Sequence, residues 1–181
     1  MKRTALAMLT ALVCTLAPLT IKQAYAQEAD ASAQFDQFSV FVGDWNCTGK
    51  HLAHGKTPAH ATTARLHGEQ AVGGQWILIR YDENKSAVNP KPFHVDEYFG
   101  YNSTRKQFVT VAAANSGYFS GASPGWSDNS ITFDEAADGK STGSRDTFTR
   151  NGQNEISHSG TEQDKDGKWI KSDEETCHRV Q

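Results

Sequence analysis

The sequence predicts an all-β domain whose short antiparallel strands close into an up-and-down barrel. Short alternating or β-rich runs recur from position 45 to near the end of the chain, turn-forming residues separate them, and no helical pattern lies between them. Cys47 and Cys177 stand near opposite ends of this region, where they can join the first and last strands of a closed barrel. A two-sheet sandwich is the alternative that the strand pattern leaves open.

The first 26 residues have the pattern of a secretory signal peptide. Lys2 and Arg3 precede an apolar run that leads into an A-x-A cleavage site at 24–26. The run is too short for a transmembrane helix and no second one follows. We therefore predict a periplasmic or secreted protein without a membrane span, with a signal peptide over 1–26, a flexible N-terminus over 27–34 and a barrel domain over 35–181.

The charge pattern gives no sign of a nucleic-acid partner. Removing the signal peptide leaves 15 of the 18 basic residues and all 21 acidic residues, so the formal net charge moves from −3 to −6. Lysine and arginine are scattered among aspartate and glutamate, which is typical of a solvated surface. This composition is compatible with a monomer or a dimer.

The predicted elements begin with a short helix over residues 33–41 (AQFDQFSVF), whose phenylalanines lie three apart and close one end of the barrel. Asn151-Gly152 predicts a tight hairpin, and 164–167, 137–139 and 101–105 predict further turns. Residues 118–128 (YFSGASPGWSD), a glycine- and proline-containing stretch, are predicted as a loop or rim. Strands are predicted at 45–52, 60–69, 73–82, 93–101, 107–115, 130–135, 145–150, 154–162 and 168–180.

The cysteines predict how the barrel closes. Cys14 leaves with the signal peptide, so the mature chain keeps Cys47 and Cys177, which an oxidising compartment favours joining. In the chain-entropy model a loop of this length gives roughly 4–5 kcal/mol. Two unpaired thiols are the alternative. If the two cysteines lie opposite each other on antiparallel neighbouring strands, Trp45 lies opposite Arg179 on the same face.

This register explains the stretch FVGDWNC at 41–47. Gly43 lets the chain turn from helix into strand, Trp45 plugs one end of the barrel, and Arg179 stacks on the indole. The alternatives are an ordinary core aromatic at Trp45 and a surface charge at Arg179.

Gly43-Asp44-Trp45 together with Arg179 resembles the G-x-W and arginine signature of lipocalins and their calycin relatives. The segments VGDWNCTG, VGGQWILIRYDE and FGYNSTRKQFV resemble a bacterial family of lipocalin-like proteins known as a domain of unknown function, over roughly residues 35–180. The resemblance implies a barrel of eight to ten strands with a central cavity. It supplies no reaction, cofactor or catalytic residue. Gly43 and Gly49 also partly resemble the first strand of haem-binding nitrobindin-like barrels.

Polar residues near the seam are candidates for ligand binding. The same register puts Asp173 opposite His51 and Glu175 opposite Gly49, all on the face of Trp45. Such a cluster can hold a cationic ligand, a metal or a transferable proton. The alternative is that these groups meet water at a bent rim.

Glu97 is a second candidate because it shares a face with the aromatic residues of strand 93–101. An ionised carboxylate there needs a partner, and we predict Arg80 of the neighbouring strand for it. Trp76, on that strand, joins the ligand-binding candidates. The alternatives are a structural ion pair or a Glu97 at a twisted rim.

We predict no metal and no cofactor. His51, His54, His60 and His67 crowd the first two strands, but they form neither an i, i+2 pair in one strand nor an H-E-x-x-H helix. A G-x-S-x-G elbow, a phosphate-binding loop and a dinucleotide fingerprint are absent.

These features predict an exported barrel that binds a small hydrophobic or amphipathic molecule through shape and one polar anchor. One alternative is a haem-binding or hydrolytic barrel that uses an interior histidine, His51 or His158. The other is a structural protein whose barrel is filled with side chains.

Overall fold

The computed structural model of the chain describes residues 32–33, 35–53 and 58–181. The predicted signal peptide, most of the predicted flexible N-terminus and His54 lie outside these residues. Among the residues described, no helix is long and apolar enough to cross a membrane.

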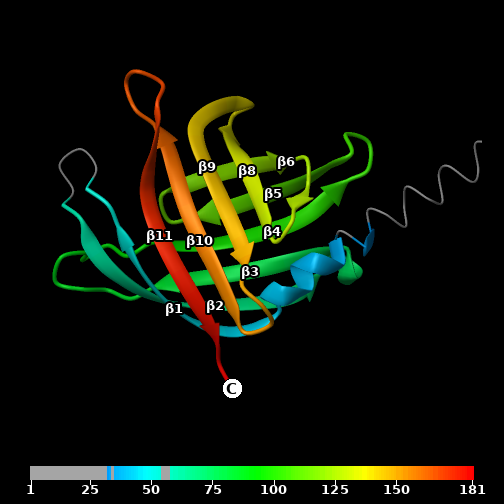
Figure 1. Ribbon diagram of the computed structural model, residues 1–181, viewed down its shortest axis with the longest axis horizontal. Helices are drawn as coiled ribbons and strands as arrows, with labels where there is room; N and C mark the ends of the chain where they lie inside the picture. Colours follow the sequence, from blue (N-terminus) through cyan, green and yellow to red (C-terminus); the bar gives the residue numbers. More distant parts are fainter. Residues whose placement is uncertain (1–31, 34, 54–57) are drawn as a thin grey trace, which may run out of the picture.

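Antiparallel strands are the main secondary structure of the described domain, as predicted. From β1 to β6 and from β8 to β11 each strand pairs with the next, β6 pairs with β8, and β11 pairs with β1. In the described part of the chain ten strands thus close a barrel, and the two-residue β7 pairs along β8 (Figure 1). The strands are β1 (Gly43–His51), β2 (His60–Ala71), β3 (Trp76–Glu83), β4 (His94–Asn102), β5 (Gln107–Ala114), β6 (Gly117–Ser123), β7 (Trp126–Ser127), β8 (Ser130–Ala137), β9 (Lys140–Arg150), β10 (Glu155–Gln163) and β11 (Trp169–Arg179).

The predicted seam between the first and last strands is confirmed. β1 and β11 pair with Cys47 opposite Cys177, Trp45 opposite Arg179 and His51 opposite Asp173. A disulfide joins the two cysteines, which lie 130 residues apart in the sequence. Since side chains alternate along a strand, this register turns Trp45, Cys47 and His51 toward the barrel interior.

An aromatic core fills one end of the barrel. The predicted N-terminal helix is a short 3₁₀ helix, η1 (Asp36–Phe41), which lies across this end (Figure 1). Its Phe38 and Phe41 are buried, and the ring centroid of Phe38 lies 5.5 Å from that of Phe108 and 5.6 Å from that of Phe99. Aromatic pairs at these distances add about 0.5–1.5 kcal/mol beyond the area they bury.

Arg179 ties η1 to the seam. Its guanidinium carbon lies 4.1 Å from the centre of the Trp45 indole, and its Nη1 and Nη2 atoms donate to the carbonyls of Val42 (2.6 Å) and Val40 (2.9 Å). Gly43 has a φ of +117°, and a Cβ at this position would lie 2.6 Å from Arg179 Nη1. Arg179 thus contacts Trp45 of β1 and the backbone around the end of η1, and Gly43 leaves room for its guanidinium.

Two predicted loops are wrong in detail. Residues 118–128 do not form one loop, because β6 occupies Gly117–Ser123. Gly121 lies within this strand because there is no room for a side chain; a Cβ there would lie 2.7 Å from Thr110 Oγ1. The tight Asn151-Gly152 hairpin is also wrong: four residues, 151–154, join β9 to β10, and the Asn151 N–H donates to the carbonyl of Glu155 at 3.0 Å.

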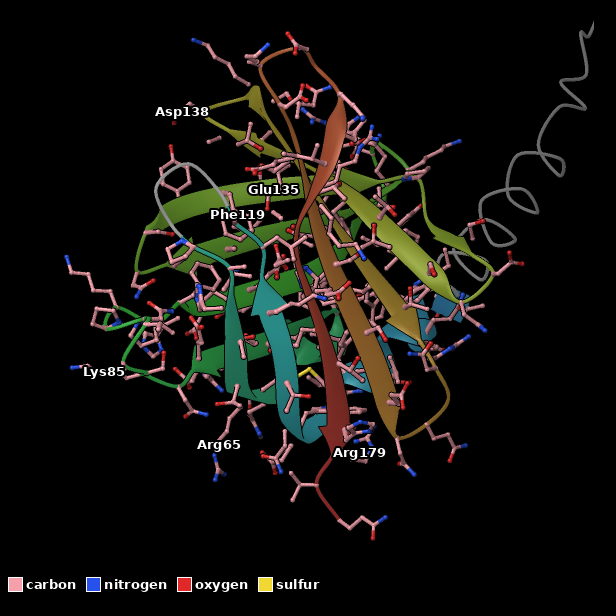
Figure 2. All side chains as sticks on the ribbon, turned by 60° about the vertical axis from the view of Figure 1, so that its left-hand side comes forward. Arg65, Lys85, Phe119, Glu135, Asp138 and Arg179 are labelled. Atoms are coloured by element: carbon pink, nitrogen blue, oxygen red, sulfur yellow. A yellow bond between two sulfur atoms is a disulfide. The ribbon has the colours of Figure 1, made fainter. Side chains whose placement is uncertain are left out.

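The opposite end of the barrel is the open one. The connections after β3, β5, β8 and β10 lie there, away from η1, as do the end of β1 and the start of β2 (Figure 1). In the view of Figure 2, Arg179 marks the closed end, and Phe119 and Glu135 lie toward the other end. A cavity runs inward from this open end.

Candidate functional site

The cavity inside the barrel has a volume of about 390 Å³. This is within the range of small-molecule sites, about 300–1,000 Å³. One part of its wall is apolar, and includes Phe41, Leu66, Ile79, Val95, Phe148 and Ile156. Another part is polar, and includes His51, Tyr81, Glu97, Glu135, Asp146, His158, Asp173 and Glu175. The barrel is therefore filled by side chains only at its closed end.

His158 on β10 lies between two carboxylates. Its Nε2 is 3.0 Å from Asp146 Oδ1 on β9, and its Nδ1 is 3.3 Å from Asp173 Oδ1 on β11. Burial alone would lower the pKa of His158, but the hydrogen bonds and charges of the two aspartates outweigh burial and raise it well above the usual value. The imidazole is therefore doubly protonated at neutral pH.

The two aspartates stay ionised because the protonated His158 lies between them. Burial alone would raise the pKa of Asp173, but hydrogen bonding and the charge of His158 lower it to about 2. The pKa of Asp146 is also lowered, because His158 again outweighs burial. The hydroxyl of Ser172 donates to the second oxygen of Asp173 at 2.7 Å.

Gly160 makes room for this arrangement. It lies opposite Asp146 on one side and Asp173 on the other. A Cβ at Gly160 would collide with the carboxylate of Asp173. Because position 160 lacks a side chain, the imidazole two residues earlier and both aspartates can meet above it.

Two glutamates beside this network have raised pKa values, in contrast to the two aspartates. Burial and the nearby charge of Asp146 raise the pKa of Glu97 to about 8, although a hydrogen bond with Thr110 opposes the shift. Burial and a hydrogen bond to Asp146 raise the pKa of Glu135 to about 8. Both carboxyls are therefore mainly protonated at neutral pH and can act as hydrogen-bond donors.

The predicted pairing of Glu97 with Arg80 is wrong. Glu97 lies opposite Ile79, so the neighbouring Arg80 points to the outer face. There it donates to Glu69 at 2.7 Å and lies 3.9 Å from Asp96.

Trp76 also lies off the cavity wall. It begins β3 at the closed end, and its ring occupies the space over Gly100 of β4, where a Cβ would lie 2.5 Å from the indole. Of the six residues predicted for ligand binding, the cavity therefore brings together four: His51, Glu97, Asp173 and Glu175.

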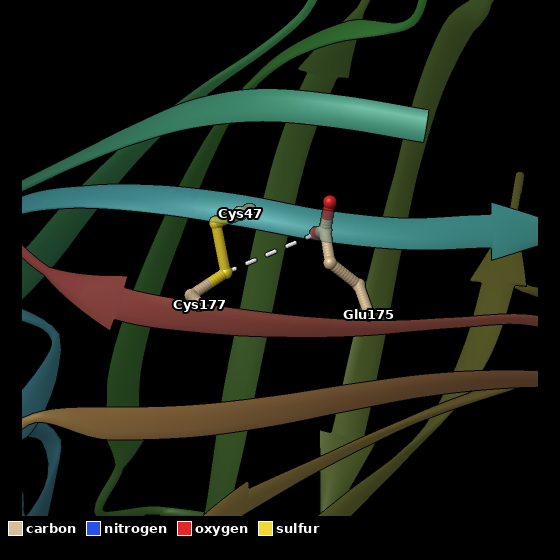
Figure 3. A group of neighbouring side chains, drawn as sticks. All are labelled: Cys47, Glu175 and Cys177. Atoms are coloured by element: carbon tan, nitrogen blue, oxygen red, sulfur yellow. Dashed lines mark hydrogen bonds between the residues drawn. A yellow bond between two sulfur atoms is a disulfide. The ribbon is translucent and has the colours of Figure 1, made fainter. Parts of the chain in front are cut away.

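Glu175 lies between a tyrosine and the disulfide. The hydroxyl of Tyr81 donates to its Oε1 at 2.9 Å, and its Oε2 lies 3.9 Å from Cys177 Sγ (Figure 3). Burial raises the pKa of Glu175, although the Tyr81 hydrogen bond opposes the shift. Burial and the Glu175 charge also raise the pKa of Tyr81. Because both sulfurs are in the disulfide, neither is free to bind a metal.

A family model described as a protein of unknown function (DUF1579) matches residues 31–179. The chain belongs to the DUF1579 family. No curated protein matches the sequence significantly.

The DUF1579 barrel also resembles solved structures. The crystal structure of Rv2717c from M. tuberculosis aligns with a TM-score of 0.60 and 15% identity, over 82% of this chain and 98% of that chain. A redesigned β-barrel aligns with a TM-score of 0.44 and 11% identity, over 79% and 94% of the two chains. A DUF3598 protein of unknown function from Nostoc punctiforme aligns with a TM-score of 0.41 and 9% identity, over 79% and 48%. The first of these likenesses supports the barrel fold, and identities this low carry no function.

Sequence reasoning missed several residues of the DUF1579 cavity, among them Tyr81, Glu135 and Asp146. A usable signal existed for one of them. Gly160 in the interior of a predicted strand indicates a close approach by a neighbouring group. In the observed β9–β10 pairing Asp146 is such a neighbour, since it lies opposite Gly160.

Proposed function

We propose that this DUF1579 protein is an exported, lipocalin-like binding protein that holds a small amphipathic molecule with a cationic head group. The observation that carries the proposal is the cavity itself, with one apolar part of the wall and one acidic part. Small-molecule sites are typically built this way, with apolar contacts for affinity and a few polar groups for orientation.

The charges of the wall favour a cation over an anion. Asp146 and Asp173 are ionised around one protonated His158, which leaves the three groups with one net negative charge. Lys50, on the cavity rim, is paired with Glu174 at 2.7 Å. An ammonium group would therefore gain charge-assisted hydrogen bonds, and a carboxylate would face like charges.

The rival functions receive less support. An imidazolium has no free nitrogen lone pair, so His158 held between two aspartates is a poor axial ligand for haem iron. A purely structural barrel has no need for a cavity of about 390 Å³. The Cys47–Cys177 disulfide supports export, because such bridges persist in oxidising compartments.

The proposal is tested with three matched probes: hexylamine, hexanol and hexanoate. We expect hexylamine to raise the thermal midpoint most, and hexanoate not to raise it. A ligand at about 100 times its Kd stabilises a folded protein by about 2.7 kcal/mol. Native mass spectrometry of protein secreted by its own host then identifies the natural cargo.

Asp173→Asn is the variant for this test, and Asp44→Asn, an exposed residue on β1, is its matched control. We expect Asp173→Asn to lose the preference for the amine and Asp44→Asn to keep it. A stronger response to hexanoate, or none to any probe, would contradict the proposal.

A further inference from the structure

Three potential metal ligands meet at the open end of the barrel. His51 ends β1 and lies opposite His60, which begins β2, and Glu83 ends β3. The donor atoms of the three side chains all lie within 4.8 Å of one another. The cluster is not evident from the sequence, because the three residues lie on three neighbouring strands and only the sheet brings them together.

His60 presents a nitrogen with no partner in the described part of the chain. Its Nδ1 lies 3.1 Å from the carbonyl oxygen of Pro58, which can only accept, so Nδ1 carries the proton. Its Nε2 therefore carries a lone pair, and this atom is buried without a hydrogen bond. A metal-binding histidine typically has this arrangement, with one nitrogen fixed by a backbone carbonyl and the other directed at the ion.

Glu83 is held in a similar way. Its side chain is 2% exposed, and its Oε2 accepts hydrogen bonds from the backbone N–H of Phe93 (2.7 Å) and the side-chain amide of Asn89 (3.0 Å). Its Oε1 faces His51, whose Nε2 lies 4.0 Å away. One oxygen thus orients the carboxylate, and the other points into the cluster.

We propose that His51, His60 and Glu83 form a binding site for a divalent transition-metal ion. Two imidazoles and one carboxylate are a common ligand set for zinc and for non-haem iron(II). Metal–donor distances are about 2.0–2.2 Å, so side-chain movements of about 1 Å bring all three donors onto one ion. His51 is 41% exposed and has room to make such a movement.

The position of the site matters for the cavity. His51 lines both the barrel cavity and the shallow depression at the open end that includes His60 and Glu83. Three protein ligands leave at least one coordination position for water or for another molecule. A bound ion thus lies beside the entrance, where it can contact a donor atom of a molecule that enters.

The test is Zn²⁺ titration by calorimetry, together with the visible spectrum of the Co²⁺ form. The full chain is purified without a polyhistidine tag and freed of metal with chelator. We expect one Zn²⁺ per chain and a Co²⁺ absorption band. We expect His60→Ala to weaken Zn²⁺ binding by more than about tenfold, since changes outside the ligand set alone cost 10–100-fold.

His67→Ala is the matched control. This histidine is on the same strand as His60 but on the outer face, where its Nδ1 lies 2.7 Å from Asp44 Oδ1. His51→Gln is a second test variant, because the exposure of His51 makes loss of folding less of a concern. Circular dichroism confirms that each variant is folded.

Three results would overturn the metal site: no stoichiometric Zn²⁺ binding to the wild type, unchanged affinity in both ligand variants, or equal weakening in His67→Ala. Hexylamine binding is measured separately, without metal. Failure of the metal site and failure of the cavity proposal therefore give different results.

Discussion

At the scale of single residues, the cavity holds some carboxyl groups that stay ionised and others that favour the protonated form. Asp173 stays ionised because His158 donates to it, whereas Glu97 favours the protonated form because it is buried near the charge of Asp146. Both residues line the same cavity. The pH dependence of stability should therefore report on individual side chains.

The first prediction concerns Glu97→Gln. A folded-state pKa of about 8, above the ordinary 4.5, means that the folded protein holds this proton where the unfolded chain has lost it. This makes the free energy of unfolding fall as pH rises from about 5 to 8. We expect Glu97→Gln to reduce that fall by at least about 1 kcal/mol, measured by urea unfolding at several pH values.

Glu69→Gln, an exposed change on β2, is the control and should keep the wild-type pH dependence. Asp173 acts in the other direction, since its lowered pKa removes stability only as pH falls from about 4 toward 2. If Glu97→Gln has the wild-type slope between pH 5 and 8, the carboxyl is ionised in the folded protein.

At the scale of elements, η1 is short and depends on the barrel for its position. Only six residues form it, and no side chain caps its N-terminal end. Phe38 and Phe41 of η1 pack into the barrel core. Arg179 donates hydrogen bonds to the carbonyls around the C-terminal end of η1. Arg179 therefore joins three elements: η1, β1 and β11.

The second prediction is that Arg179→Lys destabilises the protein by about 1–3 kcal/mol. The planar guanidinium of arginine stacks on the Trp45 indole while it donates to two carbonyls. Lysine keeps the charge, but its ammonium has no planar group and cannot do both. Chemical unfolding measures the loss. Arg65→Lys, exposed on β2, is the control (Figure 2). Equal stability of Arg179→Lys and the wild type would show that charge alone suffices.

At the scale of the whole molecule, the barrel depends on one seam between strands that are far apart in the sequence. β1 and β11 close the sheet, and the Cys47–Cys177 disulfide lies within their pairing. The other neighbouring strands in the ring are joined by shorter stretches of chain. Closing the seam therefore has the largest loss of chain entropy.

The third prediction is that the Cys47→Ala/Cys177→Ala variant loses about 2–5 kcal/mol of unfolding free energy, as is typical when a native disulfide is removed. Urea unfolding in oxidising and reducing buffer measures this. The wild type should approach the variant in reducing buffer, and the variant should be insensitive to reductant. A variant as stable as the oxidised wild type would mean that strand pairing alone closes the barrel.

Sequence reasoning succeeded where residues near each other in the chain, or a covalent bond, define the geometry. Strand alternation predicted the all-β class, and the cysteine pair predicted the β1–β11 register down to Trp45 opposite Arg179. Reasoning failed where a long loop sets the register. Ten residues, 84–93, connect β3 to β4, and a turn of that length does not determine which residue faces Glu97.

The β9–β10 hairpin shows the same limit. A two-residue turn at Asn151-Gly152 would pair His158 with Arg145. The observed hairpin places Arg150 opposite Ile156, which pairs His158 with Phe148 and brings Asp146 within reach. A small change in loop length therefore decides whether the histidine has a carboxylate partner.

The sequence by itself determined most of the strand pattern, the paired cysteines and the Trp45–Arg179 contact, because these follow from periodicity and one covalent link. Only the tertiary structure decided that His158 lies between Asp146 and Asp173, and that His51, His60 and Glu83 converge at the open end. The physical reason is that barrel closure brings together side chains from strands far apart in the chain, and loop geometry sets their register.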